Sequence, residues 1–202
     1  MGLTAYGKFQ KLRRAKHQCR AMGFRGSTAD INHLNSRMRV AQSFRGIQLE
    51  GFTRQTIQGY NGLFQLFLTH SAVERYCDIF GYKVYGLQEV MAPYDPQPVV
   101  ATFVDLDRDQ RFYTFLHERV NAQLQLNLAA CLCGDDVNVA HLSAAIRHIF
   151  AHGYLAAHAN RASPAKVYAM CTAVSDFLLS FVDQEFSAKV DAYCAAVGFE
   201  SQ

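Results

Sequence analysis

The sequence predicts an all-α protein built as a helical bundle, and three observations support this prediction. Apolar residues recur at every third or fourth position over several windows, which places them on one face of an α-helix. Residues that favour helix ends, such as glycine and a Ser-Pro pair, stand at the borders of these windows. One short run, residues 99–104, has the composition of a strand, and a lone strand would have no partner.

Two helices are expected before residue 54. Residues 4–22 place Phe9 and Leu12 on one face, and Gly23 begins a break. A second helix should begin at the Ser-Thr-Ala-Asp segment of residues 27–30 and continue to about residue 44. Its apolar positions follow the helical spacing and are Ile31, Leu34, Met38 and Ala41.

The clearest helical pattern begins at Thr53 or Thr56 and ends at Gly81, a residue type that often terminates helices. Its apolar positions are Ile57, Tyr60, Phe64, Phe67, Leu68 and Val73. Residues 82–104 are expected to form a loop, because three prolines in this segment exclude a long helix. Residues 99–104 could be extended, but a lone strand would have no partner, so we interpret them as an insertion that packs on the bundle.

Two long helices are expected after this insertion. The first runs from a capping aspartate, Asp105 or Asp107, to Gly134. The second begins at Asp136 or Asn138 and leads into a cluster of polar residues near residue 150.

The last expected helix begins at the pair Ser163-Pro164, with serine as the cap and proline in the first turn, and ends at Gly198. With four or more helices joined by short or medium connections, residues 55–202 are predicted to form the bundle.

Charge divides the chain at about residue 54. Residues 1–54 contain eleven Lys and Arg against two acidic residues, a net charge of +9, and the remainder of the chain carries −6. We therefore treat residues 1–54 as a basic N-terminal extension, which could bind RNA or another acidic partner, or pack on the acidic body of the same or a second chain. The candidate nucleic-acid-binding residues are Lys8, Lys11, Arg13, Arg14, Lys16 and Arg20.

The composition predicts a cytoplasmic protein. No run approaches 18 uncharged apolar residues, so no transmembrane helix is expected, and the N-terminus lacks the apolar core of a signal peptide. The six cysteines are scattered through apolar sequence and are expected to be reduced and mostly buried. No zinc pattern, Gly-rich phosphate loop or nucleophile elbow is present, and we expect neither a metal nor a cofactor.

The most informative stretch is residues 147–154, Arg-His-Ile-Phe-Ala-His-Gly-Tyr, which lies between apolar segments that read as helix. An arginine is a permanent charge with a planar fork of donors, and a histidine can give or take a proton near neutral pH. On an ideal helix Arg147 and His152 lie about 140° apart. Gly153 favours a helix end at this point, and the last turn could bring His152 back toward Arg147.

The spacing Arg-x4-His, with a polar residue after the arginine and a glycine after the histidine, resembles the signature of the HEPN superfamily. This family consists of small all-α domains, many of them metal-independent ribonucleases. Tyr154, two residues after His152, resembles the position found in HEPN toxins that are paired with a nucleotidyltransferase antitoxin. The run at residues 66–76, which contains Ser71 and Glu74, resembles an early HEPN helix.

The resemblance implies roles for individual residues. Arg147 would stabilise the phosphate, His152 would act as general acid or base, and two copies of the motif would line one cleft in a homodimer. Tyr154 would be the residue that the antitoxin modifies. His148 stands where the family often has Asn or Asp, and it could be a second proton carrier or a surface residue. Glu74 could hold Arg147 in place or pair with Arg75 instead.

Structural roles are equally open for the motif residues. Arg147 could be a surface arginine paired with an acid, and His152 could cap a helix C-terminus, where a positive charge is favoured. Two functional hypotheses follow. The protein is a HEPN-type endoribonuclease, such as a toxin or a stress or defence effector, or it is a non-catalytic HEPN-like dimerisation or RNA-binding module.

Overall fold

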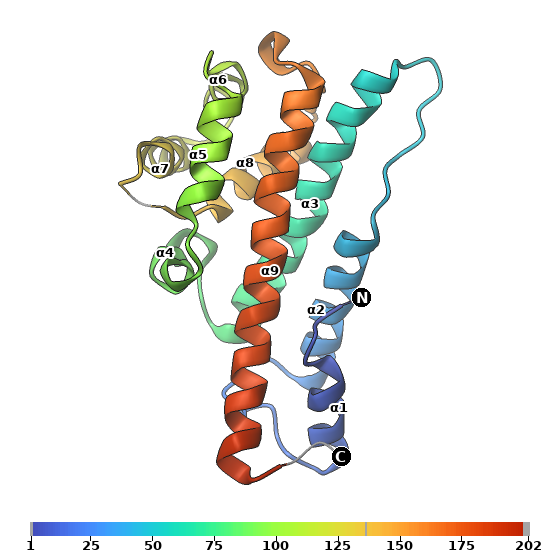
Figure 1. The fold of residues 1–202 in the computed structure, drawn as a ribbon, viewed down its shortest axis with the longest axis vertical. Coiled ribbons are helices and arrows are strands. Elements are labelled where there is room, and N and C mark those ends of the chain that lie inside the picture. The colour runs from blue at the N-terminus through green and yellow to red at the C-terminus, as the bar shows by residue number, and fades with distance from the viewer. Residues whose placement is uncertain (1, 136, 200–202) are drawn as a thin grey trace.

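The computed structural model describes residues 2–135 and 137–199, and the regular structure in these residues is helical throughout, which confirms the predicted all-α class. The bundle is elongated, with the long helices aligned along its length (Figure 1). The elements are α1 Tyr6–Arg14, α2 Thr28–Ser43, α3 Arg54–Phe80, η1 Val84–Gly86, α4 Gln88–Met91, η2 Ala92–Tyr94, α5 Gln97–Leu106, α6 Arg111–His117, α7 Ala122–Cys133, α8 Ala140–Ala151, η3 Ala159–Arg161 and α9 Pro164–Val197.

Helices α3 and α9 form the centre of the bundle and run side by side in the same direction (Figure 1). Two glycines permit their close approach near the α3 N-terminus. A Cβ atom on Gly62 would lie 2.7 Å from the Cα atom of Tyr168, and one on Gly59 would lie 2.9 Å from the Cβ atom of Pro164. Further along, the Tyr76 hydroxyl donates to Glu185 at 3.2 Å. The α3–α9 pair is therefore the surface on which the other helices pack.

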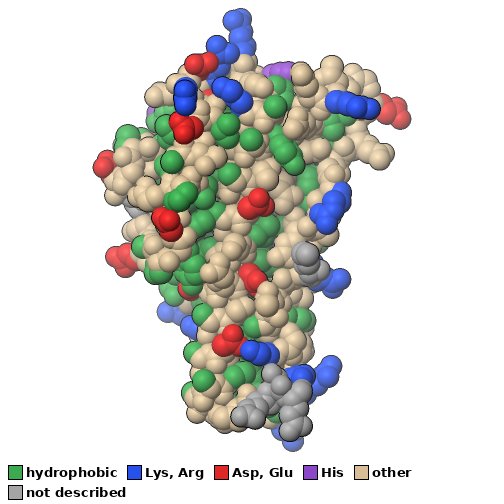
Figure 2. Space-filling model, in the orientation of Figure 1, with side chains coloured by type: hydrophobic (Ala, Val, Ile, Leu, Met, Phe, Trp, Pro, Cys, Tyr) green, Lys and Arg blue, Asp and Glu red, His purple; other side chains and the backbone are tan. Residues whose placement is uncertain are grey.

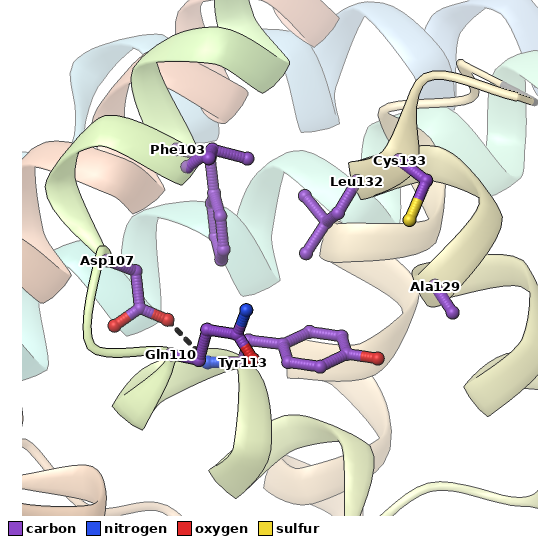
Figure 3. Close-up of a pocket in the computed structure, with 8 residues that line it drawn as sticks. Phe103, Asp107, Gln110, Tyr113, Ala129, Leu132 and Cys133 are labelled. Carbon is purple, nitrogen blue, oxygen red and sulfur yellow. Dashed lines mark hydrogen bonds between the residues drawn. The ribbon is translucent and has the colours of Figure 1, made fainter.

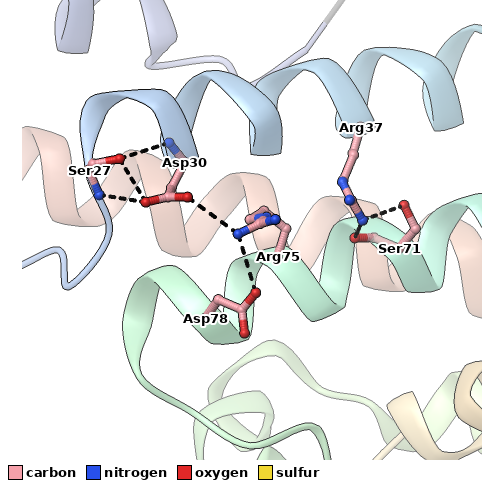
Figure 4. A network of polar contacts seen from close by, with 6 residues as sticks. All are labelled: Ser27, Asp30, Arg37, Ser71, Arg75 and Asp78. Atoms are coloured by element: carbon pink, nitrogen blue, oxygen red, sulfur yellow. Dashed lines mark hydrogen bonds and ion pairs between the residues drawn. The ribbon is translucent and has the colours of Figure 1, made fainter.

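Residues 1–54, the predicted basic extension, contribute side chains to the same core as the rest of the chain. Phe9 and Phe24 pack against Phe186 of α9, with ring centroids 6.0 and 5.4 Å apart. Helix α2 runs antiparallel to α3 and begins with a capping box, in which Ser27 and Asp30 bond each other's backbone N–H groups (Figure 4). The predicted start of this helix is confirmed.

Several elements differ from the sequence prediction. Helix α1 is shorter than residues 4–22, because the chain turns at Lys16, whose φ is +67°. The prediction that residues 82–104 form a loop is wrong, because this segment contains η1, α4 and η2, and residues 99–104 are helical and belong to α5. A proline is tolerated in the first turn of this helix, where the N–H would lack a partner anyway, and the helix buries Val100 and Phe103.

The long helix predicted between residues 105 and 134 is two helices, α6 and α7. The chain breaks between them at residues 118–121, where Val120 is buried and the Asn121 side chain caps α7 by accepting from the N–H of Leu124 at 3.0 Å. An unbroken apolar spacing concealed this capping signal. Asp107, one of the predicted caps, does bind the start of α6, where its carboxylate accepts from the N–H groups of Phe112 and Tyr113.

Other predicted helix ends are confirmed. Gly81, Gly134 and Gly198 each occupy the C-cap with a left-handed backbone. Helix α9 begins at Pro164, although the Ser163 side chain makes no capping hydrogen bond. The Asn138 side chain accepts from the N–H of Ala140 at the start of α8, and the alternative cap, Asp136, lies outside the described residues.

Helix α9 meets a length and composition criterion for a membrane span, which the sequence analysis did not anticipate. Half of its most apolar 18-residue window is buried within the bundle, and buried core helices commonly meet the same criterion. None of the six cysteines, all within the described residues, forms a disulfide, and all except Cys133 are buried, as expected. Burial raises the pKa of Cys77 to about 12.

Charged side chains are distributed unevenly over the surface. On the face in Figure 2, acidic side chains lie over the central column formed by α9, and many basic side chains lie along the edge formed by α1 and α2. Two pairs join these regions: Lys8 contacts Asp191 at 2.6 Å, and the Thr4 N–H donates to Asp183 at 2.6 Å. Part of the basic extension thus faces the acidic helix of the same chain.

We predict that Gly62→Ala lowers the free energy of unfolding by about 1–3 kcal/mol, because the added methyl group would meet the α9 backbone. Gly7→Ala is the matched control, since a Cβ atom there meets nothing within 4 Å. Its improved helix propensity should stabilise the protein by up to about 1 kcal/mol. Urea unfolding followed by circular dichroism measures both. Equal effects of the two substitutions would contradict the close α3–α9 packing.

Candidate active site

Helix α8 carries the motif and ends inside it. Leu142, Ala145, Ile146 and Ile149 are buried, which leaves position 147 on the opposite, exposed side. His152 is the C-cap, and Gly153 continues with a φ of +72° that favours glycine. His152 therefore occupies the C-terminal cap of α8, the structural position that the sequence analysis considered for it.

Of the two partners considered for Glu74, the structure shows Arg147. The Arg147 Nε atom lies 3.4 Å from the Glu74 Oε1 atom, while Arg75 instead contacts Asp30 and Asp78. The Arg147 side chain remains 53% exposed, and this ion pair engages the Nε side of its guanidinium. The two terminal nitrogens are thus available to an anion that approaches from solvent.

Glu74 is itself held by a buried polar chain that links α3 to α8. Its Oε1 atom lies 3.6 Å from the Nε2 atom of His70, whose Nδ1 atom lies 2.9 Å from the Ser143 hydroxyl. The Ser143 hydroxyl donates to the Ala140 carbonyl, so it can accept from His70. The interaction with His70, followed by the charges of Arg147 and Arg37, holds the pKa of Glu74 below 4.5 against the effect of burial.

His148 and His152 form a pair on the last turn of α8. Their ring centroids are 4.4 Å apart. The centroid of the His152 ring lies 6.4 Å from that of the Tyr154 ring. Burial of the His148 ring lowers its pKa below 6.5, and the charges of His152 and Arg147 lower the pKa further, while a hydrogen bond to the Arg119 backbone acts in the opposite direction. His148 is therefore mainly neutral at pH 7 and can accept a proton.

A small cavity of about 130 Å³ joins several of these groups. Arg147 and His148 line it from α8, and His70 and Glu74 line it from α3. Val84, Tyr85, Leu124 and Ala144 complete the wall. His152 is exposed and lies beside His148, outside the residues that line the cavity. The histidine that shares the cavity with Arg147 is therefore His148, and not His152 as the Arg-x4-His motif implied.

The remaining predicted site residues lie apart from this cavity. Tyr154 is 53% exposed, and its N–H donates to the Ile149 carbonyl at 2.9 Å. The predicted nucleic-acid-binding residues lie on and just after α1, where Arg13 bonds the His17 carbonyl and Lys8 pairs with Asp191. Lys11, Arg14, Lys16 and Arg20 are exposed.

A second cavity, of about 270 Å³, lies between α5, α6 and α7 (Figure 3). Phe103 and Leu132 supply apolar walls, and Asp107 and Tyr113 supply polar groups. The Tyr113 N–H donates to the Asp107 carboxylate at 2.7 Å, so this carboxylate serves to hold the start of α6. None of the motif residues lines the cavity, and we assign it a structural role.

Two residues of the site were missed by the sequence analysis. His70 stands four positions before Glu74, a spacing at which side chains on a helix meet, and this signal could have identified it. Tyr85 lies in the segment treated as an insertion, and its ring reaches α8, where it stacks on His141 with centroids 5.8 Å apart. No local sequence pattern predicts that contact.

Comparisons with protein-family models, curated proteins and solved structures find no match for this chain. The resemblance to HEPN proteins therefore rests on the motif residues and on the all-α fold.

We predict that His148 titrates below pH 6.5 in an NMR titration of the folded protein. His152→Gln removes the charge interaction with His152 that lowers the His148 pKa, and should raise that pKa toward 6.5 without reaching it, because burial remains. His158→Gln, at an exposed histidine bonded to Thr56 at 3.0 Å, is the control and should leave the His148 pKa unchanged. A His148 pKa at or above 6.5 in the unsubstituted protein would contradict the assignment.

The same pKa shift affects stability. The unfolded chain binds a proton at His148 more readily than the folded chain does. The stabilisation of the folded protein by neutral His148 is therefore fully present above about pH 6.5. It is lost as the pH falls below that value.

Proposed function

We propose that the protein is a metal-independent endoribonuclease of the HEPN type. The observation that carries the proposal is the exposed guanidinium of Arg147, held through Nε by Glu74 and placed beside two neighbouring histidines whose ring centroids are 4.4 Å apart. Cleavage of RNA without a metal requires a cation at the phosphate and groups that move two protons. These residue types supply both requirements.

Arg147 is suited to bind the scissile phosphate. During attack by the 2′-hydroxyl, negative charge increases on the non-bridging phosphate oxygens, and a guanidinium fork can donate to two of them. Glu74 occupies the Nε side and so orients the fork without covering it. Glu74 is therefore a positioning residue in this proposal, and Arg147 contacts the substrate.

The histidine pair can divide the acid and base roles. The His148 imidazole, kept neutral by its lowered pKa, takes the proton of the 2′-hydroxyl as the oxygen bonds to phosphorus. The bond from phosphorus to the 5′-oxygen breaks, and His152 gives a proton to that oxygen. The products are a 2′,3′-cyclic phosphate and a 5′-hydroxyl, and no water or metal is consumed in this step.

The resemblance also supports proposals about partners. A homodimer would bring a second Arg147 and a second histidine pair to one substrate, which suits a site with so few groups. Tyr154 is half-exposed at the end of the motif and is accessible to a modifying nucleotidyltransferase antitoxin. We place such an effector in the cytoplasm, where RNA is available.

We predict that the purified protein cleaves RNA in the presence of a chelator and leaves cyclic phosphate ends. Loss of a proton-transfer group should lower the rate by about 10²–10⁴-fold, so His152→Ala and His148→Ala should each abolish most cleavage. Gel analysis of a panel of single-stranded and structured RNAs measures the rate.

His158→Ala is the control, because this histidine is exposed in the same segment but bonds Thr56 instead of the motif. Cleavage that is equal in all four proteins would indicate a contaminating nuclease. If the protein binds RNA but cleaves no RNA of the panel, the alternative function, a non-catalytic RNA-binding or dimerisation module, replaces this one.

A further inference from the structure

A larger groove adjoins the proposed active site. Its volume is about 550 Å³, and it shares Glu74, Val84 and Tyr85 with the smaller cavity that Arg147 and His148 line. The other lining residues come from α2, from the end of α3 and from the segment that follows it, and they are Arg37, Arg75, Cys77, Asp78, Tyr82 and Lys83. The shared wall makes the groove a direct approach to Arg147.

The carboxylates of the groove are neutralised by neighbouring cations. Asp78 contacts Arg75 at 3.4 Å, and Glu74 contacts Arg147 at 3.4 Å. Arg75 also reaches Asp30, as the network in Figure 4 shows. An anionic ligand in the groove would therefore meet few unpaired negative charges.

Two further cations, Arg37 and Lys83, form no salt bridge with a carboxylate among the residues that the structure describes, although the charge of Arg37 helps to lower the pKa of Glu74. Arg37 donates to the carbonyl and hydroxyl oxygens of Ser71, both neutral groups, at 3.0 and 3.1 Å (Figure 4). Lys83 is exposed. Arg37, Arg75 and Lys83 outnumber the two lining carboxylates, Glu74 and Asp78, so the groove lining carries a net charge of +1. It is therefore a locally positive region beside residues 55–202, whose net charge is −6.

Aromatic rings stand at the same place on a firmly anchored segment. Helix α3 ends at Gly81 with a left-handed backbone, and the N–H of Tyr82 then donates to the Cys77 carbonyl at 2.9 Å. The Val84 carbonyl accepts from the Asn138 side chain at 2.8 Å, which ties the segment to the start of α8. The Tyr82 and Tyr85 rings are 37% and 50% exposed.

Tyr85 is the better placed of the two rings. One face of its ring stacks on His141 of α8 with an interplanar angle of 22°, and this contact holds the ring in place. Half of the surface of Tyr85 remains exposed to solvent. Three residues span at most about 11 Å, so one short segment of a nucleic-acid strand could reach both tyrosines. Rigid aromatic faces next to cations are the features that bind unpaired bases and their phosphates.

We propose that this groove binds single-stranded RNA and guides it into the active site. Bases stack on Tyr85 and Tyr82, Arg37 and Lys83 contact the phosphates, and the strand continues to Arg147. The inference rests on the proposed ribonuclease function and assigns its substrate as unpaired RNA. It also moves the RNA contact from the basic residues of α1, one of which is already paired with Asp191, to the tyrosine segment.

Binding of a fluorescent 2′-O-methyl RNA strand, measured by anisotropy, tests the groove separately from cleavage, because this RNA lacks the attacking hydroxyl. Loss of one stacking ring typically costs about 5- to 150-fold in affinity, so Tyr85→Ala should weaken binding by that factor. Tyr85→Phe keeps the ring and should bind within about twofold of the unsubstituted protein. The same strand in a duplex should bind more weakly.

Phe52→Ala is the matched control. Phe52 is 52% exposed, as Tyr85 is 50% exposed, but it precedes α3, whereas Tyr85 follows it, and this helix of 27 residues is about 40 Å long. Its removal should leave the affinity unchanged. A second comparison, the combined variant Arg14→Gln and Arg20→Gln, tests the competing surface near α1.

The outcomes separate the two proposals. Binding that depends on Tyr85 but not on Phe52 supports the groove, even if unmodified RNA is never cleaved, which would overturn the ribonuclease proposal alone. Equal binding by Tyr85→Ala and the unsubstituted protein overturns the groove. Binding lost in the Arg14 and Arg20 variant but retained in Tyr85→Ala, or tighter binding of the duplex, also overturns it.

Discussion

The crossing of α8 over α3 fixes the geometry of the motif. A hydrogen bond between His70 and Ser143, both buried, joins the two helices at 2.9 Å. A buried polar pair of this kind specifies one arrangement, because any shift would leave polar atoms without partners. Four residues further along both helices, the Glu74–Arg147 ion pair follows from the same alignment. The stacking of Phe67 on Phe150, with centroids 4.2 Å apart, supports the crossing on its other side.

The charges at this helix crossing determine which side chains can bind an anion and which can accept a proton. The position of Arg147 on the exposed side of α8 leaves its charge accessible, and its proximity disfavours a second charge on His148. The pair of histidines is thus in different environments, as acid–base chemistry with two proton transfers requires. The neighbouring groove has cations and open tyrosine rings, so binding and chemistry would occupy adjoining surfaces.

The sequence predicted the helices that carry strong local signals. The spacing of apolar residues, the capping segment at Ser27 and the glycines at positions 81, 134 and 198 identified most helix ends. Where the signals were tertiary, the prediction failed. Residues 99–104 have a composition typical of strands but become helical because Val100 and Phe103 are buried against the bundle.

The candidate site was predictable in part for the same reason. The contact between Glu74 and Arg147 was one of two alternatives that the sequence left open, and it is present. Contacts between distant segments were beyond local reasoning. Examples are His70 with Ser143, Tyr85 with His141 and the shared cavity of Arg147 with His148. Each depends on how helices cross rather than on spacing along the chain.

A double-mutant cycle on RNA cleavage tests the central claim, that Glu74 acts by positioning Arg147. The rates of the unsubstituted protein, Glu74→Gln, Arg147→Gln and the double variant are compared, with circular dichroism to verify folding. We expect Arg147→Gln to cause the larger loss, and the double variant to cleave no more slowly than Arg147→Gln alone. Independent, multiplicative losses from the two substitutions, or an unchanged rate in Glu74→Gln, would contradict the account.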